Sequence, residues 1–169
     1  SICTENNLSM ESFHAWWQDQ ITARLPEMAG SRAVQIEGEV DILRDQWGVP
    51  HIFAKTDSDL FFGYGYATAQ DRLWQLDYYR RKAMGRLSEI LGEEGLENDI
   101  LVRTVGINRI ARKEISKIAS DTLRRLDDFS SGINAFMEQT RENLPIEFDL
   151  LGYVPEPWSP LDSVAIWGE

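Results

Sequence analysis

The sequence predicts an α+β chain that is mostly helical and contains few strands. Two short extended runs, residues 40–44 and 49–54, flank the turn Asp45-Gln46-Trp47-Gly48, and this pattern is typical of a β-hairpin. From residue 57 nearly to the end of the chain, apolar residues recur at helical spacing. We therefore expect one short hairpin followed by a series of helices.

A further helix is predicted before the hairpin. Its apolar residues, at steps of three and four, are Phe13, Trp16, Trp17, Ile21 and Leu25. The pattern starts at Ser9 and is broken by Pro26. We expect the tryptophans to cover a groove on a neighbouring surface rather than to bind a ligand. Residues 28–38 then form a connector, in which residues 33–36 are a candidate strand.

A long helix is predicted over residues 57–91. Asp57-Ser58-Asp59 offers N-cap side chains, and Gly92 is the expected stop. The apolar residues on one face of its second half are Leu73, Leu76, Met84, Leu87 and Leu91. This spacing is typical of an amphipathic helix that packs on a core.

The first turns of this helix contain two glycines among aromatic residues. Gly63 and Gly65 alternate with Tyr64 and Tyr66. Each glycine costs a helix roughly 1 kcal/mol relative to alanine. We therefore expect another backbone to pack closely against these turns and to compensate for that cost.

Charged residues interleave with the apolar ones in the second half of the helix. They are Asp71, Arg72, Asp77, Arg80 and Arg81. Asp77 and Arg81 have the i,i+4 spacing of a helical ion pair. Two interpretations remain open: the charges form the solvated face of an amphipathic helix, or they form a buried polar network that joins this helix to another chain.

After Gly92, the acidic residues 93–99 indicate a loop, and residues 100–105 are ambiguous between a helix and a short strand. Two helical stripes follow. They consist of Ile107, Ile110, Ala111, Ile115 and Ile118, and then of Leu123, Leu126, Phe129, Ile133, Phe136 and Met137.

Caps and prolines indicate the boundaries of the last elements. Ser120-Asp121 is the expected N-cap of the second stripe, whose helix should end before Pro145. Residues 145–160 are rich in proline and aromatic residues, so we expect an irregular but packed segment. A final helix is predicted from Asp162 to Trp167.

Composition and motifs argue against several function classes. The 28 acidic and 17 basic side chains give a net charge of −11, which argues against a nucleic-acid partner. No run approaches 18 apolar residues, so no membrane span is expected. His14 and His51 lie far apart on different elements, the chain has one cysteine, and no HExxH or CxxC motif is present. We therefore expect no metal or cofactor site in this chain.

An ordered set of motifs is similar to a known family. These motifs are RDQWGVPHI at residues 44–52, FGYGYATAQDRLWQ at residues 62–75, GRLSEILG at residues 85–92, GINAF at residues 132–136 and PWSPLD at residues 157–162. In this order and spacing, they resemble the small α subunit of the penicillin acylase family. The resemblance divides the chain into an N-terminal extension with a helix, residues 1–39, and an acylase α-subunit body, residues 40–169.

The resemblance implies a heterodimer produced from a single precursor that cleaves itself. This chain would be the mostly helical part of a four-layer αββα fold, which a larger β subunit completes. The first residue of the β subunit, usually serine, would attack the amide bond of N-acyl compounds such as acylated β-lactams or acyl-homoserine lactones. No catalytic residue is carried over to this chain. Ser1 starts a polar stretch, and we do not expect it to be the nucleophile.

The resemblance also implies a site, a metal and a compartment. The structural residues expected to form an inter-subunit network are Gly63, Tyr64, Gly65, Tyr66, Asp71, Arg72, Arg80 and Arg81. A calcium ion, where there is one, would be held mainly by the β subunit. Members of the family are mostly exported, which favours the periplasm or secretion. The family's acyl-pocket and calcium residues of this subunit lie beyond the position that matches Glu169, so neither set is carried over.

A second hypothesis belongs to a different class of protein. Six tryptophans, five tyrosines and seven phenylalanines, in a chain without a complete catalytic set, also fit an acidic helical module that binds other proteins through an aromatic surface. Such a module would fold alone as a monomer. An obligate subunit would aggregate without its partner.

Overall fold

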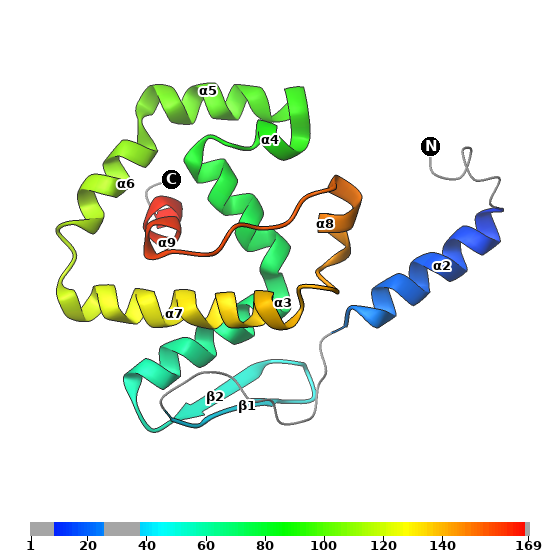
Figure 1. The fold of residues 1–169 in the computed structure, drawn as a ribbon, viewed down its shortest axis with the longest axis horizontal. Helices are drawn as coiled ribbons and strands as arrows, with labels where there is room; N and C mark the ends of the chain where they lie inside the picture. The colour runs from blue at the N-terminus through cyan, green and yellow to red at the C-terminus, as the bar shows by residue number, and fades with distance from the viewer. Residues whose placement is uncertain (1–8, 26–37, 168–169) are drawn as a thin grey trace.

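The long helix α3 lies at the centre of the fold, and α7 crosses it (Figure 1). The computed structural model describes residues 9–25 and 38–167. In chain order, the elements of this part are α2 (Met10–Ala23), β1 (Val40–Arg44), β2 (Pro50–Ala54), α3 (Asp57–Met84), α4 (Ser88–Leu91), a 3₁₀ turn (Gly92–Gly95), α5 (Leu96–Val105), α6 (Ile107–Ile115), α7 (Ser120–Gln139), α8 (Ile146–Leu151) and α9 (Pro160–Trp167).

The predicted hairpin is confirmed, with β1 and β2 paired antiparallel over their full length. At the turn, the Asp45 carboxylate accepts hydrogen bonds from the backbone N–H groups of Trp47 (2.8 Å) and Val49 (3.0 Å). Gly48 has a φ of +78°, which glycine adopts without a steric cost. β2 begins at Pro50, one residue later than the sequence pattern indicates.

α3 ends earlier than predicted. Gly85 adopts a left-handed conformation (φ +65°), and its N–H bonds to carbonyls of the last turn, so the helix stops at Met84. Gly92, the predicted stop, instead follows the separate short helix α4. Within α3, the backbone of Arg72 (φ −147°, ψ 30°) leaves the helical region, and a kink there divides the helix into two halves.

Two predicted N-caps are displaced. Thr56, and not the stretch Asp57-Ser58-Asp59, caps α3 by accepting a hydrogen bond from the N–H of Asp59 at 3.1 Å. Ser120 already lies inside α7, and Ala119 occupies the cap position without a side-chain hydrogen bond. Both corrections shift a helix start by only one residue, and both helices are confirmed.

α3 and α7 cross at very short range because each presents a glycine to the other. A Cβ atom on Gly65 would lie 2.0 Å from the carbonyl oxygen of Phe129 on α7. A Cβ atom on Gly132 would lie 2.0 Å from the carbonyl oxygen of Phe62 on α3. Neither position has room for a side chain, so the close backbone packing predicted at Gly65 is confirmed.

The core surrounds this crossing in two clusters. The larger joins α3, α7, α8 and the segment after α8, and its buried members are Phe62, Tyr66, Ala69, Leu73, Ile133, Phe136, Leu144, Phe148 and Trp158. The smaller joins the end of α3 to α6, α7 and α9, and its buried members are Ala83, Met84, Ala111, Leu126, Val164 and Ala165. Both predicted helical stripes supply residues to these clusters and are confirmed as α6 and α7.

Residues 93–99 are not a loop, contrary to the prediction. The 3₁₀ turn and the start of α5 occupy them, and residues 100–105 complete α5 as a helix. Asp99 gives the physical reason, because it is buried and accepts hydrogen bonds from the backbone N–H groups of Leu87 (2.8 Å) and Ser88 (2.9 Å). Asp99 of the acidic stretch thus binds the backbone N–H groups at the start of α4.

Residues 145–160 are more regular than predicted. The short helix α8 forms there because Phe148 is almost completely buried in the larger cluster. Residues 153–159 then follow an irregular path, as predicted, and Trp158 in this path is buried. α9 begins at Pro160, two residues before the predicted start.

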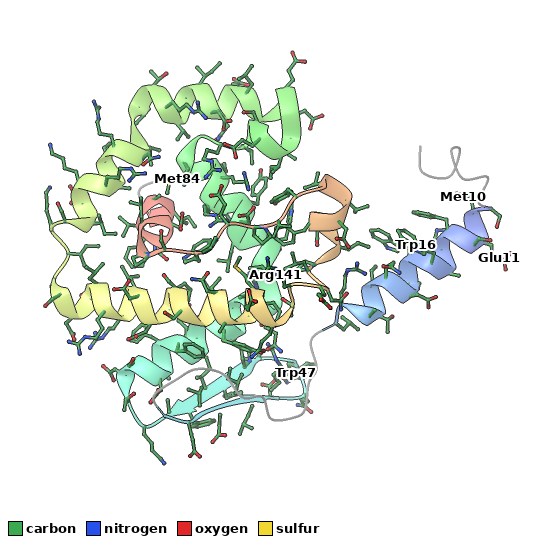
Figure 2. All side chains as sticks on the ribbon, viewed as in Figure 1. Met10, Glu11, Trp16, Trp47, Met84 and Arg141 are labelled. Atoms are coloured by element: carbon green, nitrogen blue, oxygen red, sulfur yellow. The ribbon has the colours of Figure 1, made fainter. Side chains whose placement is uncertain are left out.

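α2 confirms the predicted first helix and extends away from the body (Figure 1). Its C-terminal end is held by polar contacts: Arg24 donates to the carbonyl of Leu144 (3.0 Å), and Asn143 donates to the carbonyl of Ala23 (2.8 Å). None of its residues is buried, and Trp16, labelled in Figure 2, is 40% exposed. The described residues thus form no groove over its tryptophans, and the candidate strand at residues 33–36 lies outside them.

Candidate functional site

The glycines and tyrosines singled out in the sequence lie in the first half of α3. Gly65 faces α7, and Gly63 faces the hairpin, whose side chains leave no space for a Cβ atom there. Tyr66 is buried, and its hydroxyl donates to Oε1 of Gln139 on α7 at 2.7 Å. Tyr64 is 54% exposed. Three of the four residues therefore serve packing inside this chain, whereas Tyr64 lies at its surface.

Asp71 and Arg72 lie at the kink of α3, and both are exposed. Asp71 pairs with Arg44 of β1 (2.7 Å), and Arg44 also donates to the carbonyl of Gly48 (2.8 Å). This group ties the hairpin turn to the middle of α3. Arg72 has no hydrogen bond or ion pair with any described residue, so its guanidinium is free to meet another chain.

The second half of α3 carries a buried polar network centred on Asp77. The Asp77 carboxylate is almost fully buried and pairs with Arg80 and with Nε of Arg81 (2.8 Å). It also accepts a hydrogen bond from the hydroxyl of Tyr153 (2.9 Å). The predicted i,i+4 pair is confirmed. Two buried cations thus share one buried carboxylate, and the loss of any of these partners would leave buried charge less compensated.

The two arginines hold the irregular segment before α9 against α3. Arg80 donates to the carbonyls of Glu156 (3.0 Å) and Pro157 (3.2 Å) and lies over the ring of Trp158, 5.3 Å from its centroid. Arg81 lies over the ring of Tyr153 at 4.8 Å. These contacts combine hydrogen bonds with cation–π attraction. A segment without secondary structure is thereby given a fixed path.

The network reaches the surface through Arg86, which pairs with Glu156 (2.7 Å) and Glu89 (2.8 Å). Hydrogen bonds from Arg86 lower the pKa of Glu156 to about 2, although burial opposes the shift. The same contacts, first with Glu156 and then with Glu89, raise the pKa of Arg86. At neutral pH these groups are therefore fully charged.

Arg81 and Tyr153 do not change their protonation state near neutral pH. Burial lowers the pKa of Arg81, but the hydrogen bond and the charge of Asp77 outweigh burial, and the net change is upward. Burial is the main cause of the raised pKa of Tyr153, and the Asp77 carboxylate adds to it. Neither side chain is suited to transfer a proton at pH 7.

The structure joins some of the predicted site residues and separates others. Arg80 and Arg81 meet in the buried network, whereas Asp71 and Arg72 lie apart from it at the exposed kink. Among the described residues, the four do not form one network. Their contact with a second chain stays a prediction. The network residues that the sequence did not single out are Arg86, Glu89, Tyr153, Glu156 and Asp162.

Two kinds of site are absent from the described part of the chain. Within residues 9–25 and 38–167, no group of three or more His, Cys, Asp or Glu side chains is arranged to hold a metal ion. In the same ranges, no helix combines the length and the apolar character that a transmembrane span requires.

A match to a family model identifies the family of this chain. The family model described as penicillin amidase matches residues 39–168, which include the hairpin and all the helices from α3 to α9. This chain belongs to the penicillin amidase family. The resemblance seen in the motifs is thereby confirmed.

Curated members of the penicillin amidase family are similar over most of this chain. Penicillin acylase 2 proenzyme of Pseudomonas sp. strain SE83 is 39% identical over 150 residues, which are 88% of this chain and 19% of that protein. Penicillin G acylase of Escherichia coli is 34% identical over 139 residues, 80% of this chain and 16% of that protein. Acyl-homoserine lactone acylase QuiP of Pseudomonas aeruginosa is 32% identical over 161 residues, 95% of this chain and 19% of that protein.

These matches cover most of this chain but only a small part of each relative. The chain spans about a fifth of the length of these relatives and matches their N-terminal part. A solved structure of thermostable penicillin G acylase from Alcaligenes faecalis matches with a TM-score of 0.70 and 36% identity, over 77% of this chain and 70% of that chain. The helical body with its hairpin is therefore the fold of one chain of a penicillin amidase.

Proposed function

We propose that this chain is the α subunit of a heterodimeric acylase that hydrolyses the amide bond of N-acyl compounds, either acylated β-lactams or acyl-homoserine lactones. The observation that carries the proposal is the match to the N-terminal fifth of proteins named as acylases, together with the penicillin amidase family match over residues 39–168. The remaining four-fifths correspond to a larger β subunit from the same precursor.

In the proposed reaction, the N-terminal serine of the β subunit attacks the carbonyl carbon of the amide. The C–N bond breaks, the amine leaves with a proton, and an acyl-enzyme remains. Water then attacks the ester, releases the carboxylic acid and restores the serine hydroxyl. The contribution of this chain is structural, because the charged groups of its central network are committed to each other.

The hairpin supports an obligate partner. Its outward-facing side chains include Leu43 (59% exposed) and Phe53 (57% exposed), and Trp47 at its turn is 80% exposed (Figure 2). In the described ranges, the sheet has only these two strands, so each strand keeps one edge with unpaired N–H and C=O groups. Apolar side chains beside open strand edges favour pairing with strands of another chain.

The complete enzyme would then have a four-layer αββα fold. Two sheets of the β subunit form the inner layers, and the helices of this chain cover part of the outside. Any calcium ion would be held mainly by the β subunit.

The proposal is tested with the complete precursor and a panel of N-acyl substrates. The panel contains an aromatic phenylacetyl amide, an aliphatic acyl-homoserine lactone and a glutaryl amide. We expect maturation into two chains and release of the free acid from one class, with both lost when the first residue of the β subunit is replaced by alanine. A processed enzyme that hydrolyses none of these amides would contradict the substrate class.

The exposed aromatic side chains of α2 and the hairpin also fit the second hypothesis, a helical module that binds other proteins. Expression of residues 1–169 alone separates the two functions. A monomer that unfolds cooperatively would favour the module. Aggregation that is relieved by co-expression of the rest of the precursor would favour the subunit.

A further inference from the structure

A hollow lined by arginines lies between the end of α3, α5 and α6. Its volume is about 560 Å³, and its lining residues are Met84, Arg86, Glu89, Val102, Arg103, Gly106, Asn108, Arg109 and Arg112. Four of these nine residues are arginines, although the whole chain carries a net charge of −11. We call this feature the arginine hollow. The positive charge of the hollow is opposite in sign to the net charge of the whole chain.

Three of the four arginines have guanidinium groups whose N–H donors are not all used by the described residues. Arg109 makes no ion pair or hydrogen bond with a described residue. Arg103 uses only Nε, towards the carbonyl of Gly85 (2.7 Å), and Arg112 uses only Nε, towards Asn108 (2.9 Å). All three side chains belong to exposed residues. Their terminal N–H groups therefore remain as donors for an acceptor from outside.

The carboxylate that lines the hollow already forms ion pairs within this chain. Glu89 is the one carboxylate among its lining residues, and it pairs with Arg81 (2.6 Å) and Arg86 (2.8 Å). The arginine hollow thus has an excess of positive charge. Carboxylates are the natural partners, since a guanidinium can donate two parallel hydrogen bonds to one carboxylate.

The floor of the hollow is apolar. Met84 and Val102 line it, and they are only 8% and 4% exposed. A ligand that fits has carboxylates placed at the rim and apolar groups directed at the floor. An acidic polypeptide segment with interspersed apolar side chains meets both requirements.

We propose that the arginine hollow binds an acidic segment of the β subunit, and this inference rests on the function proposed above. About four-fifths of the relatives' length lies outside this chain. The hollow's excess of positive charge and the exposed guanidinium groups of Arg103, Arg109 and Arg112 are complementary to the carboxylates of such a segment.

A tethered protein segment fits this site better than a free small anion. An ion pair at an exposed site contributes only about 0.2–1 kcal/mol. A small carboxylate held by such pairs alone would bind weakly. A segment of a partner subunit brings several carboxylates at a high effective concentration, so that the same weak pairs act together.

The test uses charge reversal in the complete precursor with an affinity tag on this chain. The variant carries Arg109→Glu and Arg112→Glu, and the matched control carries Lys113→Glu on the same helix, outside the hollow. Retention of the β subunit on the tagged chain is measured at increasing NaCl concentration. We expect the double variant to release the β subunit roughly tenfold faster than the wild type and the control.

A charge-preserving variant provides a second measurement if charge reversal blocks maturation. Arg109→Lys places a primary amine in the hollow, where a zero-length carbodiimide joins it to any carboxylate in contact. Mass spectrometry should then identify a link to an Asp or Glu of the β subunit. The same reaction on Lys113, in the same sample, measures the background.

The outcomes are distinguishable. If the wild-type precursor gives no second chain, the proposed function fails. If the second chain forms, but the double variant releases it like the control and no link to the β subunit appears, the inference about the hollow is wrong. A change in KM for a carboxylate-bearing substrate with unchanged release of the β subunit would make the hollow a small-molecule site and would also overturn the inference.

Discussion

The α3–α7 crossing and helix α2 are held by different means. At the crossing, glycines remove side chains so that two backbones touch, and the surrounding residues are buried. α2 has no buried residue and is tied by polar contacts at its C-terminal end. The comparison shows which part of the molecule this chain specifies by itself. The crossing is complete within the chain, whereas the described residues leave the aromatic face of α2 uncovered.

The α3–α7 crossing and α2 also differ in how much packing stabilises them. Gly65 and Gly132 each cost their helix roughly 1 kcal/mol in propensity, and the dense packing that they permit recovers that cost. The rings of Phe13 and Trp17 stack on each other, and none of the residues of α2 is buried. A change at the crossing should therefore affect the whole molecule, and a change at α2 should stay local.

The largest effect is expected from Asp77→Ala, which breaks the buried network on α3. Arg80 and Arg81, both buried, would lose the buried carboxylate that they share, at a cost of about 3–5 kcal/mol. We expect little or no processed enzyme. The measurement is the yield and thermal unfolding of the matured protein. Asp121→Ala removes an exposed carboxylate that also pairs with two arginines, and its effect should stay below about 1 kcal/mol.

Gly65→Val should follow, because its Cβ would overlap the carbonyl oxygen of Phe129. Such overpacking against a backbone costs of order 3 kcal/mol. The expected result is a large fall in the midpoint of thermal unfolding. Thr68→Val puts the same side chain into the same helix at a partly exposed position and serves as the control. Equal stability of the two variants would refute the close-packing explanation.

Arg24→Ala tests how the C-terminal end of α2 is held to the body. The variant loses the contacts of α2 with Leu144 and Asp149. We expect global stability to change by about 1 kcal/mol or less, while hydrogen exchange of residues 10–23 becomes much faster and that of α3 is unchanged. Arg141→Ala is the matched control, since Arg141 is exposed and 3.7 Å from its partner Glu138 (Figure 2). A clear loss of stability of the whole body, with faster hydrogen exchange in α3, would contradict a local role.

The smallest effect concerns the pH dependence at the rim of the network. The pKa of Glu156 falls from its ordinary 4.5 to about 2. A lowered pKa means that the stabilisation is complete above pH 4.5 and is lost as the pH falls towards 2. Because Glu156 is half exposed, the expected loss is under about 1 kcal/mol. Thermal unfolding between pH 5 and pH 2 should show it, and Glu156→Gln should remove it.

Local patterns in the sequence were sufficient for the elements whose contacts lie near in the chain. The hairpin turn is fixed by Asp45, which directly follows β1, and by Gly48, two residues before β2. The helices at residues 107–115 and 120–139 follow from stripes that do enter the core. The i,i+4 pair of Asp77 and Arg81 also required no distant information.

The sequence patterns were insufficient where a distant partner decides. Gly85 and Gly92 both have positive φ, and the chain does not show locally which of them ends α3. Asp99 turns an acidic stretch into a helix through hydrogen bonds to Leu87 and Ser88. Tyr153 reaches Asp77 across 76 positions in the sequence, so no periodicity relates them. The long-range members of the network were missed for this reason.

The intact mass of the active enzyme tests most directly whether this chain is one of two subunits. The complete precursor is expressed, purified by its amide-hydrolysing activity and analysed by mass spectrometry under denaturing conditions. We predict two polypeptides, the smaller one containing residues 9–167 and the larger one beginning with a nucleophilic residue. Full activity in a single uncleaved chain, or in a preparation that contains only the smaller one, would contradict the assignment.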